Sequence, residues 1–254
     1  MRIQVIRPRC VHRRLSALVA YVACALSCGG GSPAPLPSPV SPAPVTQTIQ
    51  SVTDGDTVRL TAPLLGTSSV RLVNIDSPEL GGASQEPWAA ASRDALRALL
   101  PAGTVVQVVT GPVPLDSFNR VLGVIVRSDG LDVNREQLRQ GHAATYFIWP
   151  NAERFLEYRA AQIEAQDSGR AIWSASAPLR EQPFEYRLRT NNDTATRPAG
   201  DVLTRRFVDG PDYRFVHVNN RLFFGSALEA AAAGYEACQK DASGYLAFCF
   251  APGR

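Results

Sequence analysis

Lysine and histidine are scarce in this chain of 254 residues: Lys240 is the sole lysine, and there are three histidines. Beyond the first 28 residues only His142 and His217 remain, and they lie far apart in the sequence. We interpret each as a packing or surface residue, which argues against a zinc hydrolase or a histidine-metal nuclease. Arginine therefore carries nearly all of the positive charge, and its planar guanidinium is the better partner for a phosphate group.

An excess of positive charge is also lacking in most of the chain. The formal net charge is +3, but the first 28 residues hold five arginines and no acidic residue. The remainder has 21 basic and 23 acidic residues, a net charge of −2. No global basic field is left to attract a nucleic acid. Binding of an anion must therefore depend on individually placed arginines or on a metal ion.

The apolar run Leu15–Leu26 is too short to span a membrane. It follows a basic segment and precedes Cys28, an order that resembles a bacterial lipoprotein signal over residues 1–28, in which Cys28 would be lipidated. Cleavage after Ala25 would instead give a soluble secreted protein. We expect an exported protein in either case, anchored to the membrane of the bacterial envelope by the lipid or free as a secreted or periplasmic protein. Residues 29–46, rich in Pro, Gly and Ser, predict an extended tether.

Beyond the tether, short apolar segments alternate with turn residues. Helices are predicted at 85–100, after a cap at Asp132 and after a cap at Asn151. Strands are predicted where Val, Ile and Leu are frequent, at 46–52, 56–62, 68–76, 103–111 and 119–128. This order of elements predicts an α+β fold built on a small closed β-barrel.

The last third of the chain differs in composition. Residues 174–201 are polar and aperiodic, which predicts a linker between a barrel domain at 47–173 and a small C-terminal α/β domain at 202–254, whose role stays unknown. A hairpin is predicted around Asn219-Asn220. Cys238 and Cys249 would form a disulfide in an oxidising compartment, and two independent thiols are the alternative.

Three polar clusters lie at the ends of predicted strands, where a scaffold positions functional groups. Carboxylates are hard oxygen ligands suited to Ca²⁺, guanidinium groups bind phosphate, and a glutamate can activate water. Taken singly, the clusters have simpler interpretations as a hairpin turn or as surface salt bridges. The clusters are Asp54, Asp56 and Thr57 in DGDT, Arg71, Asp76 and Glu79 in RLVNIDSPE, and Asp116 and Arg120 in DSFNR.

These motifs, in this order and spacing, resemble those of the staphylococcal-nuclease-like (thermonuclease) family over about residues 47–173. The resemblance implies an oligonucleotide-binding-type five-stranded β-barrel with three helices. It also implies a calcium-dependent phosphodiesterase, an endonuclease acting on DNA and/or RNA, with a 5′-oxygen leaving group and 3′-phosphate products. The alternative is a non-catalytic barrel on the cell envelope that binds nucleic acid or protein.

The resemblance assigns the metal site to the first two clusters. Asp56, Asp76 and the backbone carbonyl of Ser77 would bind Ca²⁺. Asp54 and Thr57 would support the loop behind the ion.

The same resemblance assigns the chemistry and the contacts to substrate. Arg71 and Arg120 would hold the scissile phosphate and stabilise the charge that grows on its oxygens, and Glu79 would act as general base. Aromatic side chains would contact the bases, and the candidates are Phe118, Tyr146 and Trp149. We expect the protein to act as a monomer.

Overall fold

The computed structural model describes residues 43–81, 86–240 and 249–250. All of them belong to one compact unit that spans Pro39–Arg254. The predicted signal segment with Cys28, and most of the predicted tether, lie outside the described residues. Within the described ranges, no helix has both the length and the apolar character needed to cross a membrane.

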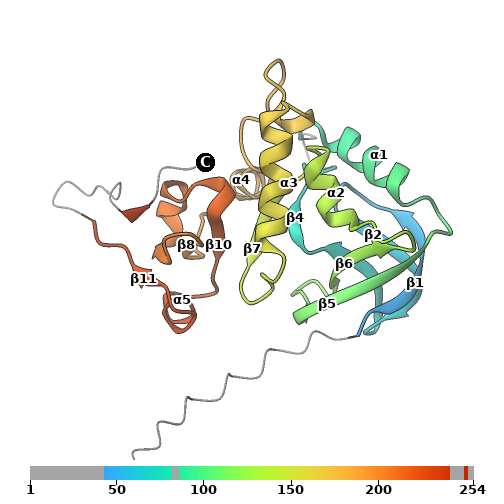
Figure 1. Ribbon diagram of the computed structural model, residues 1–254, viewed down its shortest axis with the longest axis horizontal. Coiled ribbons are helices and arrows are strands. Elements are labelled where there is room, and N and C mark those ends of the chain that lie inside the picture. The colour runs from blue at the N-terminus through green and yellow to red at the C-terminus, as the bar shows by residue number, and fades with distance from the viewer. Residues whose placement is uncertain (1–42, 82–85, 241–248, 251–254) are drawn as a thin grey trace, which may run out of the picture. The chain divides into compact units, whose positions relative to one another are not determined.

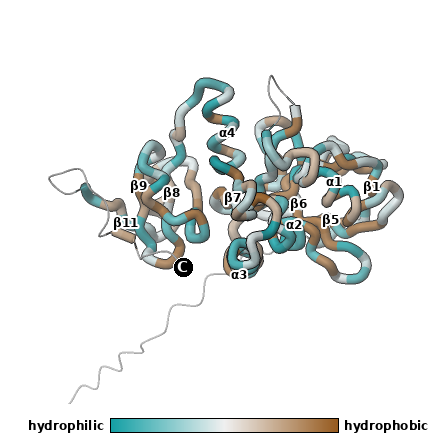
Figure 2. Tube along the Cα trace, turned by 90° about the horizontal axis from the view of Figure 1, so that it is seen from above, coloured by the Kyte–Doolittle hydropathy of each residue, from teal (hydrophilic) through white to brown (hydrophobic). Residues whose placement is uncertain are grey.

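Five strands close into a barrel in the order β1-β2-β3-β6-β5 (Figure 1). Neighbouring strands are antiparallel except β3 and β6, which pair in parallel. Residues such as Ile49, Val58 and Val70 fill the interior and are fully buried. In Figure 2, β6 is hydrophobic along most of its length. The barrel confirms the predicted fold class, and its strands are β1 Val45–Val52, β2 Thr57–Leu64, β3 Thr67–Leu72, β5 Val105–Leu115 and β6 Val121–Arg127.

Three helices accompany the barrel: α1 Ala89–Leu99, α2 Val133–Arg139 and α3 Phe155–Asp167. The predicted cap at Asp132 is present, because its side chain accepts a hydrogen bond from the backbone N–H of Arg135 at 3.0 Å. The predicted cap at Asn151 is wrong. Its amide side chain instead bonds both the N–H and the carbonyl of Val113 in β5, at 3.0 and 2.8 Å, and α3 begins four residues later.

A second sheet starts where the barrel chain leaves β3. Its order is β11-β9-β8-β10-β7-β4, so strands from the C-terminal region extend the sheet that contains Asp76. β10 pairs in parallel with β7, placing Leu222 opposite Phe147, and β7 pairs with β4 in antiparallel fashion. The strands are β4 Asn74–Asp76, β7 Ala144–Ile148, β8 Ala199–Asp201, β9 Arg206–Val208, β10 Arg221–Phe223 and β11 Glu236–Ala237.

The C-terminal third differs from the predicted linker and separate domain. Helix α4, Pro183–Thr190, and strand β8 lie in the segment that was predicted to be aperiodic. Phe207 and Leu222 belong to the same buried hydrophobic cluster as Ile49 of the barrel, so this region shares the core. The remaining elements are the 3-10 turns η1 Ala171–Trp173, η2 Gly210–Phe215 and η3 Val218–Asn220, and helix α5 Ala227–Ala232.

Two local features of this region bear on the sequence predictions. The predicted hairpin at Asn219-Asn220 is absent, and the pair forms η3 with both side chains buried. Asn219 accepts a hydrogen bond from Gln162 at 2.6 Å, and Asn220 donates one to Asp201 at 3.3 Å. Tertiary contacts therefore replace the turn. The structure links Cys238 and Cys249 by a disulfide.

Candidate active site

The DGDT loop joins β1 to β2 and lies tightly against the start of the loop after β4. The backbone N–H of Asp56 donates to Asp54 at 3.1 Å, and the hydroxyl of Thr57 donates to Asp56 at 3.2 Å. A Cβ on Gly55 would lie 2.7 Å from Cβ of Ser77, closer than real contacts allow. The glycine therefore lets the DGDT loop approach Ser77 closely and also suits the turn. At this short separation Asp56 accepts a hydrogen bond from the N–H of Ser77 at 2.6 Å.

Arg71 of β3 connects the two aspartates that were predicted to bind the metal ion. Its Nη1 lies 2.8 Å from Oδ1 of Asp56, and its Nη2 lies 2.7 Å from Oδ1 of Asp76. Both carboxylates are buried, so they face one another across a single guanidinium rather than bulk water. The structure thus brings together Asp56, Asp76, Ser77 and Arg71.

The donors at this point have the chemistry that a hard divalent cation requires. Two carboxylates meet there and contact Ser77 through its backbone N–H, and oxygen is the ligand atom that Ca²⁺ prefers. Within the described part of the chain, no group of three or more His, Cys, Asp or Glu side chains is arranged to hold a metal ion. A cation at this place would therefore need backbone or water oxygens beside the two aspartates.

Several acidic side chains lie close together in the site, and their mutual repulsion favours the binding of a cation. Burial, and then the charge of Asp56, raise the pKa of Asp54 to about 7. Burial also raises the pKa of Glu79. For Arg71 burial acts in the opposite sense, but the charges of Asp56 and Asp76 prevail and raise its pKa. The carboxylates outnumber the positive groups that touch them, so an added positive charge would relieve their repulsion.

Glu79 follows β4 and is held by a second glutamate that the sequence analysis missed. The N–H of Glu79 donates to Oε2 of Glu86 at 2.8 Å, and the N–H of Glu86 donates to the carbonyl of Glu79 at 3.2 Å. Glu86 is 1% exposed, and burial raises its pKa to about 7. This reciprocal pair fixes the backbone of the candidate base.

Arg187 of α4 is a second residue that the sequence analysis missed. Its Nη1 lies 2.6 Å from Oε1 of Glu79 and 2.8 Å from Oδ1 of Asp76, and its Nη2 lies 3.0 Å from Oδ2 of Asp76. The residue comes from the segment that was predicted to be a linker. No local pattern marks it, because its partners are more than 100 positions earlier.

Gln137 of α2 is a third missed residue. Its side-chain amide donates to the carbonyl of Gly55 at 2.8 Å and to the carbonyl of Ser92 at 3.2 Å. The side chain is fully buried, so it ties the DGDT loop to α1 and α2.

Arg120 and Phe118 lie at the start of β6, next to the strand that carries Arg71. The guanidinium of Arg120 bonds Asp116 at 2.7 Å and lies 5.5 Å from the ring centroid of Phe118. Phe118 is 78% exposed. Arg120 is therefore oriented by Asp116 instead of by the aspartates of the site, while Phe118 offers an open aromatic face.

The other two aromatic candidates are packed against protein. Tyr146 stacks on Phe184 of α4 with ring centroids 5.4 Å apart and lies 5.2 Å from Phe223. Trp149 lies 6.2 Å from Phe224 and packs on the hydrophobic core. The base-stacking role predicted for Tyr146 would need its contact with Phe184 to open.

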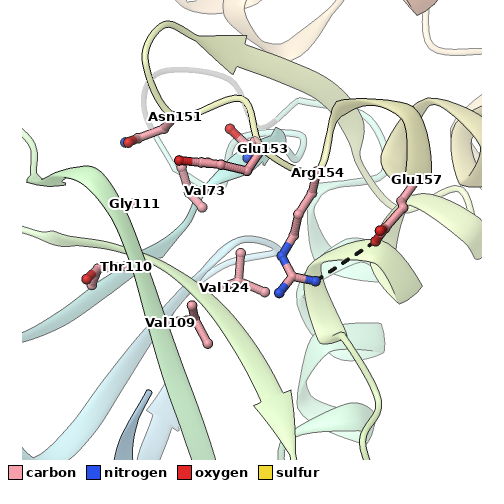
Figure 3. A pocket seen from close by; sticks show the side chains of 10 residues that line it. Val73, Val109, Thr110, Gly111, Val124, Asn151, Glu153, Arg154 and Glu157 are labelled. Carbon is pink, nitrogen blue, oxygen red and sulfur yellow. Dashed lines mark ion pairs between the residues drawn. The ribbon is translucent and has the colours of Figure 1, made fainter. Parts of the chain in front are cut away.

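A cavity of about 280 Å³ lies between β5, β6 and the start of α3 (Figure 3). Valines, including Val73, Val109 and Val124, form one side of its lining. Arg154 and Glu157, which form an ion pair at 4.0 Å, contribute from the other. The lining includes none of the residues predicted to bind metal or to catalyse, so this cavity is not the candidate site.

Comparison with known proteins identifies a family and several relatives of this chain. The family described as "Staphylococcal nuclease homologue" matches residues 69–175. An "Uncharacterized endonuclease" of Escherichia coli is 31% identical over 151 residues, which cover 59% of this chain and 90% of that protein. The chain belongs to the staphylococcal nuclease homologue family. This confirms the family that the three motifs indicated.

A longer relative matches more of the chain. "Endonuclease YhcR" of Bacillus subtilis (strain 168) is 37% identical over 197 residues, or 74% of this chain. The chain spans only 16% of the length of that protein. An uncharacterized endonuclease of Escherichia coli O157:H7 is 31% identical over 151 residues and 90% of its length. Arg187 lies outside the residues that the family description matches.

Proposed function

We propose that this protein is a calcium-dependent nuclease that hydrolyses phosphodiester bonds of DNA and/or RNA. The observation that carries the proposal is the convergence of Asp56 and Asp76 on one guanidinium of Arg71, at 2.8 and 2.7 Å. The family and the names of the relatives support nuclease chemistry. The oxygen donors fit a hard divalent cation, and the choice of calcium rests on the resemblance noted in the sequence.

The mechanism assigns each residue a contact with substrate or ion. Asp56, Asp76 and the carbonyl of Ser77 would hold Ca²⁺, which when bound supplies positive charge next to the phosphate. Glu79, whose pKa burial raises, takes a proton from the attacking water. Attack in line at phosphorus breaks the bond to the 5′-oxygen, which takes a proton from solvent water and leaves as a 5′-hydroxyl, so that the other product ends in a 3′-phosphate.

The arginines stabilise the charge that grows on the phosphate. Arg71 and Arg120 donate to its nonbridging oxygens, and each is already oriented by a carboxylate, Arg71 by Asp56 and Asp76 and Arg120 by Asp116. Arg120 is preorganised by Asp116 and costs little reorganisation at the moment of reaction, whereas Arg71 has to turn from Asp56 and Asp76 toward the phosphate once the cation binds. The exposed ring of Phe118 is the contact for a base.

We also propose that the protein is exported and acts as a monomer. The order of a basic segment, an apolar run and Cys28 supports a lipid anchor on the envelope membrane. The disulfide between Cys238 and Cys249 fits an oxidising compartment. Both the anchored form and the free form would act outside the cytoplasm.

The test is cleavage of plasmid DNA and of a single-stranded RNA by the purified protein with Ca²⁺, and again after chelation. We expect degradation of at least one substrate with Ca²⁺, 3′-phosphate ends on the products, and no degradation after chelation. A non-catalytic binding barrel would retain nucleic acid without shortening it, and that result would contradict the proposal.

A further inference from the structure

Arg187 is the feature of the site that the proposed function does not yet use. It contacts both the candidate base Glu79 and the candidate metal ligand Asp76, with three N–O distances between 2.6 and 3.0 Å. The residue lies beyond the part of the chain that the family description matches. The segment after the barrel therefore delivers a guanidinium to the centre of the site.

The contacts are unlike those of an ordinary surface ion pair. Asp76 is 1% exposed, and Arg187 engages both of its oxygens while its own side chain is about one-third exposed. Arg189, two residues later on the same helix, pairs with Glu181 on the surface and is 60% exposed. Exposed pairs of that kind contribute little to stability, whereas a bidentate contact to a buried carboxylate is specific in geometry.

The helix that carries Arg187 is fixed in place. Phe184 lies three residues earlier, on the same face of α4, and packs on Tyr146 and Phe223 with ring centroids 5.4 and 5.3 Å away. At the helix start, Gln182 and Glu185 form a capping box around Pro183. An anchored helix with one long, flexible side chain at its inner face is suited to presenting a guanidinium that can move between partners.

Binding of a divalent cation would change what Arg187 touches. A cation on Asp76 would take oxygens that now accept from Nη2 of Arg187 and Nη2 of Arg71, so these two donors would lose their partner, while Nη1 of Arg187 would keep Glu79. Unpaired donors in a partly buried site need another acceptor. The nonbridging oxygens of a phosphate beside the ion are such acceptors, and arginine matches their geometry.

We infer that Arg187 is a third substrate-contacting arginine, which binds a nonbridging oxygen of the scissile phosphate once the cation has replaced it on Asp76. The inference rests on the proposed function and adds to it a residue contributed by the C-terminal region. The competing interpretation is a plug, in which Arg187 only blocks the site of the metal ion. Both interpretations predict competition with the cation, but they predict opposite effects on cleavage.

The experiment compares wild type with Arg187→Gln, Arg187→Lys and the matched control Arg189→Gln on the same helix. Calorimetric titration with Ca²⁺ alone, without nucleic acid, measures the competition. Initial rates on a labelled oligonucleotide at saturating Ca²⁺ measure kcat/KM. Thermal unfolding of each variant checks the fold. If Arg187→Gln unfolds, Arg187→Lys still tests the inference, because it keeps a positive charge beside Asp76 and Glu79.

We expect Arg187→Gln to bind Ca²⁺ about tenfold more tightly, because a competing positive charge is gone. Its kcat/KM should nevertheless fall by roughly 10²-fold, with Arg187→Lys intermediate and Arg189→Gln unchanged. Unchanged or faster cleavage by Arg187→Gln and Arg187→Lys would overturn the inference in favour of a plug and leave the proposed function intact. Weaker Ca²⁺ binding by Arg187→Gln would overturn the part of the inference in which the cation replaces Arg187 on Asp76. A wild type that fails to cleave contradicts the proposed function itself, and the inference with it.

Discussion

Gly55 packs so closely against Ser77 that a methyl group at Gly55 would lie 2.7 Å from both Cβ and Oγ of Ser77. The DGDT motif and the segment after β4 are therefore fitted to each other through the glycine. This contact sets the spacing between Asp56 and the backbone that carries Ser77. The glycine between Asp54 and Asp56 is thus explained by packing as well as by a turn.

Gly55→Ala should separate these two segments. The added carbon also meets Ser92 of α1 at 2.7 Å, so the substitution should destabilise the fold by about 1–3 kcal/mol, the range for overpacked cores. Urea unfolding measures this loss, and cleavage should fall further than the loss of folded protein explains. Gly225→Ala is the control, because its nearest neighbour is the flexible end of Glu229 at 3.0 Å. Equal stability of Gly55→Ala and wild type would contradict the packing argument.

Glu79→Gln should reduce turnover by roughly 10²-fold or more, since glutamine cannot take a proton from water. Affinity for Ca²⁺ should stay close to that of wild type, because Glu79 is not among the proposed ligands. Single-turnover cleavage and calcium titration together separate these effects. Glu157→Gln, at an exposed position of α3, is the matched control. Turnover near the wild-type value would remove Glu79 from the mechanism.

Glu86 should make stability depend on pH in an unusual direction. Its folded-state pKa is raised to about 7 from 4.5, so the native state holds a proton that the unfolded chain releases. Stability from this group is present below the unfolded pKa and is lost as the pH rises from about 4.5 to about 7.

Glu86→Gln mimics the protonated acid at every pH. The free energy of unfolding of the variant minus that of wild type should therefore rise by on the order of 1–3 kcal/mol from pH 5 to pH 8, because only wild type loses the contribution of Glu86 over this range. Urea unfolding of both proteins at the two pH values measures the difference. The same difference between variant and wild type at both pH values would show that Glu86 is not a buried, protonated acid.

Phe118→Ala should weaken binding of single-stranded oligonucleotides without affecting the fold. The ring is 78% exposed, and a stacked base contributes about 1–3 kcal/mol, which corresponds to roughly 5- to 150-fold in affinity. Fluorescence anisotropy with a labelled oligonucleotide measures the change. Leu228→Ala removes a side chain that is equally exposed, at 80%, and should bind as wild type does. Equal affinities of all three proteins would rule out stacking on Phe118.

The parts of the structure that the sequence predicted are those encoded in local patterns. Alternating Val, Ile and Leu indicated the barrel strands, and Asp132 indicated the start of α2. The resemblance of the DGDT and RLVNIDSPE motifs to those of the family assigned Asp56, Asp76 and Arg71 to one site, and the structure brings their side chains together. Family membership then followed from the order of the motifs.

The parts that could not be predicted depend on contacts between distant segments. Arg187 reaches Glu79 across 108 positions, and the helix that carries it has eight residues, too few for a clear periodic pattern. Asn151 resembles a helix cap but bonds β5 instead. Glu86 resembles an ordinary glutamate in the first turn of the helix predicted at 85–100 until its burial against Glu79 is known.

The most direct test of the account is a crystal structure with Ca²⁺ and a short oligonucleotide bound to the Glu79→Gln variant. We predict one ion held by Asp56, Asp76 and the carbonyl of Ser77, with the phosphate beside it and Arg71 turned from the carboxylates toward the phosphate oxygens. An ion bound elsewhere, with Asp56 and Asp76 still paired to Arg71, would contradict the account.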